Sequence, residues 1–157
     1  MNEKTNVMRI LDQKKIPYTE HHLDSEEALS AVDLAGKLNV DAKKVYKTLV
    51  TVSKSRHYYV FMLAGEDQLD LKKAAKAAKE KSIEMIPQKE LYPLTGYVHG
   101  GCSPIGMKKT FPTFISTDVK ELDSFLCSAG KIGHMVELTY ADLAKVIRIQ
   151  MADIKTE

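Results

Sequence analysis

The sequence predicts a single α+β domain in which a mixed sheet is flanked by helices. Segments with a helical spacing of apolar residues and segments rich in β-branched and aromatic residues alternate along the chain, without the regular βαβ order of a doubly wound fold. The length of 157 residues is close to the usual size of one domain. No internal repeat or low-complexity linker divides the chain, so we expect one domain over residues 1–157.

The first quarter of the chain predicts two helices and one short strand. Apolar residues recur at helical spacing over residues 7–11, and residues 18–23 are expected to form a strand. The acidic run DSEE, residues 24–27, favours the start of a second helix. That helix continues through the apolar stripe of residues 31–38, and Asn39 is expected to close it.

The middle of the chain predicts a hairpin followed by a basic helix. The segments VYKTLVTV (45–52) and YYVFMLA (58–64) are β-branched and aromatic, and the polar stretch between them predicts a turn. An alanine-lined stripe over residues 71–78 then predicts an amphipathic helix. Four lysines lie on the opposite side of that helix: Lys72, Lys73, Lys76 and Lys79.

The second half predicts a structured loop, three strands and a last helix. Three glycines and a proline rule out a regular helix over residues 97–106. Short strands are expected over residues 111–116, 124–128 and 134–138. A capping box and an apolar stripe over residues 139–147 predict a helix, and the chain is expected to end on that helix and a short tail.

Composition excludes several functional classes. No apolar run approaches the roughly 18 residues of a membrane span, and the charged N-terminus does not have the pattern of a secretory signal, so we expect a soluble cytoplasmic protein. The two cysteines are too few for a disulfide framework, and His21 and His22 are adjacent with no third ligand nearby, so we expect no metal and no cofactor. The net charge of +2 means that any contact with nucleic acid is local.

Three segments are candidates for chemistry, although the common signatures of nucleophile elbows, phosphate loops and zinc helices are missing. Lys47 interrupts an apolar strand, where a lysine needs a partner or a task, unless it simply lies at a sheet edge. Gly100 and Gly101 allow a ligand to approach the backbone closely, or they serve a tight turn. The segment SAGKIG, residues 128–133, either holds an anion or connects two strands.

The basic helix of residues 71–78 is most simply a solvated face. Further pairs of lysines occur at residues 43–44 and 108–109. If these clusters come together in the fold, they form a local phosphate-binding surface in spite of the small net charge.

Four segments taken in order resemble one family. The segments are VYKTL, LDLKKAAKA, TGYVHGGCSPIGMKK and SAGKIG, and they resemble the YbaK/EbsC family of free-standing tRNA-editing proteins, which is related to the editing insertion of bacterial prolyl-tRNA synthetases. The resemblance extends from about Glu20 to about Asp153. It implies a mixed fold with a curved, barrel-like sheet and flanking helices, and a pocket for the aminoacylated 3′ adenosine of tRNA.

The resemblance also implies roles for individual residues. The implied catalytic residues are Lys47, Gly100, Gly101 and Ser128. The implied substrate-binding residues are Thr48, His21, Ser30, Ser103, Pro104, Gly130 and Lys131, and the implied tRNA-binding residues are Lys72, Lys73 and Lys76.

The implied activity is hydrolysis of mischarged Cys-tRNA(Pro), and of Cys-tRNA(Cys) as a further substrate. The thiol of the substrate would attack its own ester carbonyl and leave as a thiolactone, so Cys102 and Cys127 would not take part in the chemistry. The implied partners are the acceptor end of aminoacyl-tRNA and prolyl-tRNA synthetase. Two alternatives stay open: an editing enzyme for another small amino acid, since some family members have an aromatic pair where this chain has His21 and Ser30, and a tRNA-binding or synthetase-binding module without catalysis.

Overall fold

The computed structural model describes residues 4–24 and 29–157. The α-helices are α1 (Asn6–Gln13), α2 (Ala31–Leu38), α3 (Leu71–Ala78), α4 (Leu91–Thr95) and α5 (Tyr140–Leu143). The strands are β1 (Thr19–His22), β2 (Tyr46–Ser53), β3 (Tyr58–Ala64), β4 (Ile83–Met85), β5 (Thr113–Ser116), β6 (Phe125–Lys131), β7 (His134–Leu138) and β8 (Ile149–Ala152). Short 3-10 helices are η1 (Ala42–Lys44), η2 (Gln88–Glu90) and η3 (Thr117–Glu121).

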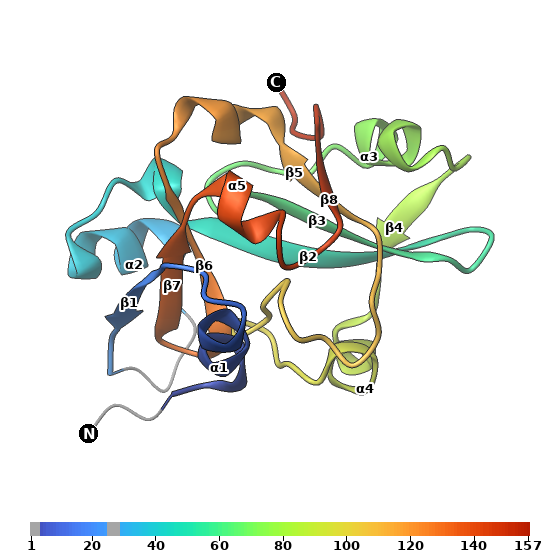
Figure 1. Ribbon diagram of the computed structural model, residues 1–157. Coiled ribbons are helices and arrows are strands. Elements are labelled where there is room, and N and C mark those ends of the chain that lie inside the picture. The colour runs from blue at the N-terminus through green and yellow to red at the C-terminus, as the bar shows by residue number, and fades with distance from the viewer. Residues whose placement is uncertain (1–3, 25–28) are drawn as a thin grey trace.

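The described strands form two sheets (Figure 1). The smaller sheet has the order β1-β7-β6, and both of its pairs are antiparallel. The larger sheet has the order β4-β2-β3-β5-β8, with two antiparallel pairs followed by two parallel pairs. The predicted α+β class with a mixed sheet is therefore confirmed. The barrel-like description goes too far, because in the described part of the chain the strands divide into two sheets and do not close.

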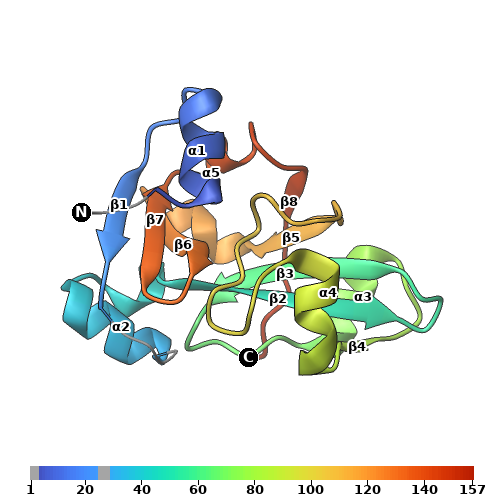
Figure 2. The same cartoon turned by 90° about the horizontal axis from the view of Figure 1, so that it is seen from below.

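The predicted hairpin is β2 and β3, which pair in an unbroken register from Tyr46 opposite Ala64 to Val52 opposite Tyr58. Because successive side chains of a strand point to opposite faces, Lys47 and Thr48 point to different faces of the larger sheet. Helix α3 covers one face, and α4 lies on the other (Figures 1 and 2). Ala74 of α3 is fully buried in the apolar cluster between α3 and the larger sheet.

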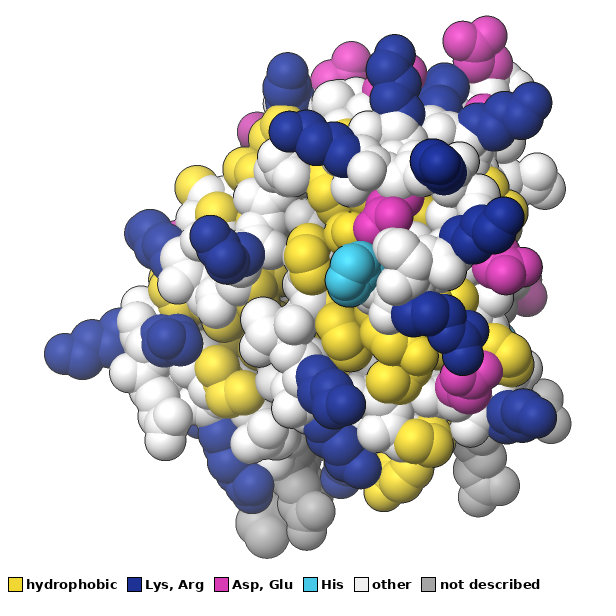
Figure 3. Space-filling view, turned by 90° about the vertical axis from the view of Figure 1, so that its right-hand side faces the viewer, with side chains coloured by type: hydrophobic (Ala, Val, Ile, Leu, Met, Phe, Trp, Pro, Cys, Tyr) yellow, Lys and Arg dark blue, Asp and Glu magenta, His cyan; other side chains and the backbone are white. Residues whose placement is uncertain are grey.

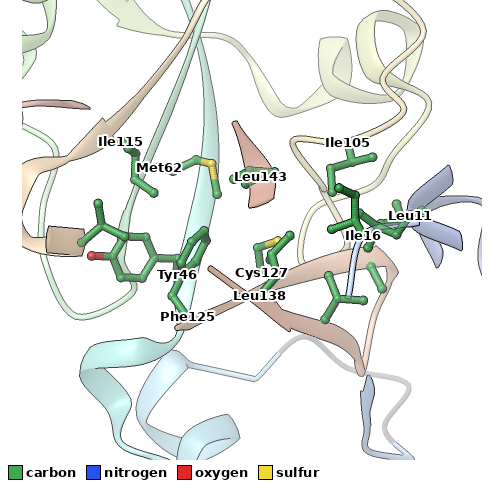
Figure 4. Packing of buried hydrophobic residues seen from close by; sticks show 14 of the residues in the cluster. Leu11, Ile16, Tyr46, Met62, Ile105, Ile115, Phe125, Cys127, Leu138 and Leu143 are labelled. Carbon is green, nitrogen blue, oxygen red and sulfur yellow. The ribbon is translucent and has the colours of Figure 1, made fainter. Parts of the chain in front are cut away.

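The main core lies between the two sheets and is closed by α1 and α5. Figure 4 shows how side chains from both sheets meet there. The buried side chains include Leu11, Tyr46, Met62, Ile105, Ile115, Phe125, Cys127, Leu138 and Leu143. Each buried aliphatic side chain stabilises the fold by about 1.5–3 kcal/mol relative to its exposed state. This shared core holds the smaller sheet against the start of β2.

Helix boundaries follow from local capping. The Oγ of Ser30 accepts a hydrogen bond from the backbone N–H of Asp33, which starts α2 at Ala31. The expected helix start at DSEE falls largely outside the described residues, since only its first residue, Asp24, is described. Asn39 closes α2 in a left-handed conformation, as predicted.

The predicted C-terminal end is wrong. Helix α5 is a single turn, although the Thr139 hydroxyl accepts from the N–H of Asp142 as the capping box predicted. The chain then continues into β8, which pairs in parallel with β5 at the edge of the larger sheet. None of the helices in the described ranges is both long enough and apolar enough to cross a membrane.

Candidate active site

A cavity of about 290 Å³ lies where α2, the start of β2, β6 and the glycine loop meet, and this loop is the segment between α4 and β5, residues 96–112. Its volume is at the lower end of the usual range for small-molecule sites. The lining residues that the sequence singled out are Ser30, Lys47, Thr48, Gly100 and Ser128. The structure therefore brings together residues that are up to 98 positions apart in the sequence (128 − 30).

Lys47 is held by the turn that follows β3. Its Nζ donates hydrogen bonds to the carbonyl oxygens of Gly65 at 3.2 Å and Asp67 at 2.5 Å. Burial lowers the pKa of Lys47, and the charge of Asp67 opposes that shift. An ammonium group has three N–H donors, so two carbonyl partners leave one N–H for a bound ligand.

Two hydroxyl groups line the same cavity, and Thr48 does so from the other face of β2 than Lys47, because β4 does not cover the edge of β2 at residues 47–49. The Oγ1 of Thr48 is buried and has no hydrogen-bond partner among the described residues. A buried polar atom without a partner costs about 1–3 kcal/mol. The Oγ of Ser128 accepts from the N–H of Gly130 at 3.1 Å, and its own O–H is left to donate.

The glycine loop is fixed by close packing. Gly100 has a φ of +87°, which favours glycine. A Cβ on Gly101 would lie 3.1 Å from the backbone nitrogen of Ile132, so this glycine lets the β6–β7 turn approach the loop. The N–H of Gly101 already donates to the carbonyl of Val98 at 2.9 Å. Gly101 thus supports the cavity wall, and its amide is not available to a ligand.

Sequence reasoning did not single out His99, which lines the cavity beside Cys102. Burial raises the pKa of the Cys102 thiol to about 12, and a hydrogen bond with Thr95 only partly opposes this. A thiol with this pKa is almost entirely protonated at neutral pH and is a poor nucleophile. No hydrogen bond links His99 to Cys102 in the described ranges.

Other lining residues are apolar and give no signal of their own in the sequence. They include Leu29, Leu34, Leu91 and Met135. They lie in three separate regions, at the start of α2, in α4 and in β7, so only the tertiary structure shows that they share one cavity. Gly65 also lines the cavity, because it follows β3 where the chain passes under α2.

Six of the implied site residues do not line the cavity: His21, Gly101, Ser103, Pro104, Gly130 and Lys131. The Nε2 of His21 instead lies 2.8 Å from the Oε1 of Glu137. Ser103 is fully buried, and its Oγ accepts from the N–H of Ile105. Lys131 is an exposed residue at the bulge between β6 and β7.

The lysines of α3 are not part of the cavity. Lys72 and Lys76 are exposed, while the Nζ of Lys73 bonds to Asp153 and to the carbonyl of Lys155. Basic side chains are spread over the face of the molecule on the α3 and α4 side, with hydrophobic and acidic side chains between them (Figure 3). Among the described residues no group of three or more His, Cys, Asp or Glu side chains is arranged to hold a metal ion.

Comparison with known proteins identifies relatives along most of the chain. Residues 25–146 match the family described as the aminoacyl-tRNA editing domain. A protein of Enterococcus faecalis, named EbsC and described as a proposed Cys-tRNA(Pro)/Cys-tRNA(Cys) deacylase, is 42% identical over 156 residues, which cover 99% of this chain and 95% of that protein. A proline–tRNA ligase of Nitrosomonas eutropha is 28% identical over 80% of this chain, which corresponds to 22% of the ligase.

The fold also has a counterpart among solved structures. A structure described as a proposed trans-editing enzyme for prolyl-tRNA synthetase superposes with a TM-score of 0.83 and covers 99% of this chain and 100% of its own. The two sequences are 21% identical, so the likeness shows a common fold.

Proposed function

Because this chain belongs to the family of aminoacyl-tRNA editing domains, we propose that it is a free-standing deacylase for Cys-tRNA(Pro) and Cys-tRNA(Cys). The substrates follow from the EbsC relative, which is similar along nearly its whole length. The single observation that carries the proposal is the cavity of about 290 Å³ in which Lys47, Thr48, Gly100 and Ser128 converge.

The polar groups of the cavity suit an aminoacyl ester. The remaining N–H of Lys47 and the hydroxyls of Thr48 and Ser128 are donors that could face the sugar, the terminal phosphate or the ester oxygen of the substrate. The N–H of Gly100 has no partner in the described part of the chain and is available to the developing oxyanion. The apolar side of the cavity, with Leu34 and Met135, holds a small side chain.

The proposed mechanism uses the substrate's own thiol as the nucleophile. Its sulfur forms a bond to the ester carbonyl carbon, and the bond from that carbon to the ribose oxygen breaks. The thiol loses one proton and the ribose oxygen gains one. The products are a thiolactone and tRNA with a free hydroxyl. The high pKa of Cys102 supports this route, because the cysteine at the cavity is not an activated nucleophile.

A deacylation assay tests the proposal. Purified protein is incubated separately with Cys-tRNA(Pro), Cys-tRNA(Cys), Ala-tRNA(Pro) and Pro-tRNA(Pro), and the loss of each ester is compared with buffer. We expect both cysteinyl esters to be cleaved and the prolyl ester to be spared. Loss of all four at the buffer rate would contradict the proposal.

A deacylase for another small amino acid is the second candidate. The observation that favours it is the polar residue Ser30, which is exposed, lines the cavity and caps α2. Pockets that distinguish side chains differing by about one methylene do so by only ~1–3 kcal/mol. Cleavage of Ala-tRNA(Pro) in preference to Cys-tRNA(Pro) in the same assay would favour this candidate.

We also propose prolyl-tRNA synthetase as a partner, since the related domain is part of that enzyme in Nitrosomonas eutropha. Co-sedimentation of this protein with synthetase and tRNA at micromolar concentration is the test. We expect a ternary complex, and its absence would count against the partnership.

A further inference from the structure

A second hollow surface lies on the other side of the glycine loop. One hollow of about 550 Å³ is formed by residues 110–113 and by residues around the start of β8. An adjoining hollow of about 330 Å³ is formed by α1 and by residues 104–113. Five residues line both, so the two form one continuous groove: Thr110, Phe111, Thr113, Ile147 and Arg148.

The charged side chains that line this groove all carry the same sign. They are Lys14, Lys109 and Arg148, and no Asp or Glu lines either hollow. We call this surface the basic groove. All three residues are exposed, and none of their side chains lies within ion-pair distance of a carboxylate in the described ranges. By contrast, Lys73 and Lys155 elsewhere on the molecule pair with carboxylates.

Unpaired cations of like sign repel one another, and an acidic polymer relieves that repulsion. The net charge of the chain is only +2, so this concentration of positive charge is local. The three cations come from the C-terminal end of α1, the glycine loop and the residue before β8, and they are exposed along the groove. Cations spread over three segments along a groove suit the phosphates of a nucleic-acid backbone better than one small anion, which needs donors that converge on a point.

Successive parts of the glycine loop line the active-site cavity and the basic groove. Gly100 and Cys102 line the cavity, whereas residues 104–107 line the groove. The hydroxyl of Tyr97 donates to the carbonyl of Ile105 at 2.5 Å and braces the loop between them. Lys109 is seven positions after Cys102, so even a fully extended chain would place them within about 25 Å.

The two neighbouring lysines of the loop extend the positive charge from the groove toward the cavity. The Nζ of Lys108 lies 5.0 Å from the ring centroid of Tyr92 on α4, next to Leu91 of the cavity wall. Lys109 lines the groove. The loop that lines the cavity at Gly100 and Cys102 thus also carries Lys108 and Lys109.

We propose that the basic groove binds the phosphate backbone of the tRNA acceptor stem while the unpaired 3′ end occupies the cavity. The inference rests on the proposed function for the identity of the nucleic acid. It assigns tRNA binding to Lys14, Lys109 and Arg148, in addition to the lysines of α3 that the sequence suggested.

The test compares two triple variants with the same change in charge. The groove variant carries Lys14→Gln, Lys109→Gln and Arg148→Gln. The control carries Lys54→Gln, Lys81→Gln and Lys120→Gln, which are exposed and line neither the groove nor the cavity. Affinity for uncharged tRNA is measured at several salt concentrations, after thermal unfolding has shown that both variants are folded.

Loss of one phosphate contact lowers the slope of log affinity against log salt by about 0.9. We therefore expect the slope of the groove variant to fall by about 2–3, and that of the control to stay at the wild-type value. Replacing the three residues by cations of the other type, Lys14→Arg, Lys109→Arg and Arg148→Lys, should restore the slope. Equal slopes and affinities for the groove variant and the control would overturn the inference.

A second arm separates this inference from the proposed function. Cysteinyl adenosine has the ester but lacks the acceptor stem. If the groove binds the stem, the groove variant should cleave this small substrate like the wild type and should show a raised KM for Cys-tRNA(Pro) only. If the wild-type protein cleaves neither substrate but tRNA binding still depends on the groove, the proposed function fails and the groove assignment stands. An equal loss of activity on both substrates would contradict the groove assignment.

Discussion

Cys102 is the residue most easily mistaken for a nucleophile, because it lies in the glycine loop and lines the cavity next to His99. The residue Cys102 is only 8% exposed, and burial raises the pKa of its thiol to about 12. Cys127 lies in the core, where burial also raises its pKa to about 12. Both cysteines therefore behave as small apolar side chains at neutral pH.

We predict that Cys102→Ala keeps the deacylation rate within about tenfold of the wild type, which corresponds to ~1.4 kcal/mol in the barrier. The reason is that sulfur from the substrate, and not from the protein, attacks the ester. Single-turnover rates with Cys-tRNA(Pro) are the measurement, and Cys127→Ala is the matched control for loss of a buried thiol. A loss above ~10³-fold with the fold intact would make Cys102 the nucleophile.

We predict that Lys47→Ala lowers kcat/KM by on the order of 10²-fold or more, as removal of one donor from an anion-stabilising site does elsewhere. It should also reduce stability by about 1–3 kcal/mol, because the carbonyls of Gly65 and Asp67 lose their donor. Lys54→Ala, at the far end of the same hairpin, should change neither quantity. Wild-type kcat/KM in Lys47→Ala would remove Lys47 from the site.

At the scale of residues, the sequence indicated the polar half of the cavity. Lys47 stands out because it interrupts an apolar strand, and Gly100 because it adjoins another glycine. His99 does not stand out, since a single histidine in a loop has no spacing partner. His21 is on the opposite side of β1 from His22, and its partner Glu137 is 116 residues away, so its position depends on a strand pairing that local patterns do not determine.

At the scale of elements, length decided which helices periodicity could find, whereas the strands β1 and β5 were predicted although each has only four residues. Helices α1, α2 and α3 have eight residues each and contain a full apolar stripe, so periodicity found them. The segments β4, α4 and β8 have three to five residues, which is too short for a period to show. Strand β8 forms by pairing with the edge strand β5, and this contact between distant segments is not visible in the local sequence.

Gly65 gives a test of how α2 is positioned over the cavity. A Cβ at this residue would lie 2.2 Å from the Cβ of Ala31, so Gly65→Ala forces the start of α2 to move. We predict a lower midpoint of thermal unfolding and a raised KM for Cys-tRNA(Pro), because Ala31 lines the cavity.

Gly36 supplies the control for that substitution. It lies within α2, and a Cβ there would meet no atom within 4 Å. Gly36→Ala should therefore stabilise the protein by about 0.5–1 kcal/mol through helix propensity and leave the KM unchanged. Equal effects of the two substitutions on KM would show that contact with Ala31 does not position α2.

At the scale of the whole molecule, one carboxylate ties the two sheets together. Glu137 on β7 accepts from Lys44 of η1 at 2.8 Å, from Ser124 before β6, and lies 2.8 Å from the Nε2 of His21 on β1. Helix η1 leads directly into β2, which carries Lys47. The network therefore joins the smaller sheet to the strand that supplies the central residue of the candidate site.

The same network predicts how stability depends on pH. The pKa of Glu137 is lowered from 4.5 to about 2, although burial alone would raise it. The largest cause of this lowering is the hydrogen bond from Lys44, followed by the hydrogen bonds with Ser124 and His21. A carboxylate whose pKa is lower in the folded state stabilises the fold above its unfolded pKa, and that stabilisation is lost as the pH falls toward the folded pKa. The contribution of Glu137 should thus be complete above pH 4.5 and disappear between pH 4.5 and about 2.

We predict that Glu137→Gln lowers the free energy of unfolding by about 1–3 kcal/mol at pH 7, because Lys44 and His21 lose a charged acceptor. Near pH 3 the difference between wild type and variant should be much smaller, since the wild-type carboxylate is then losing its advantage. Urea unfolding at both pH values and constant ionic strength measures the two differences. Glu84→Gln, on the exposed edge strand β4, is the control and should change stability at neither pH. A Glu137→Gln effect of the same size at pH 7 and pH 3 would show that the side chain stabilises the junction by packing and not through its charge.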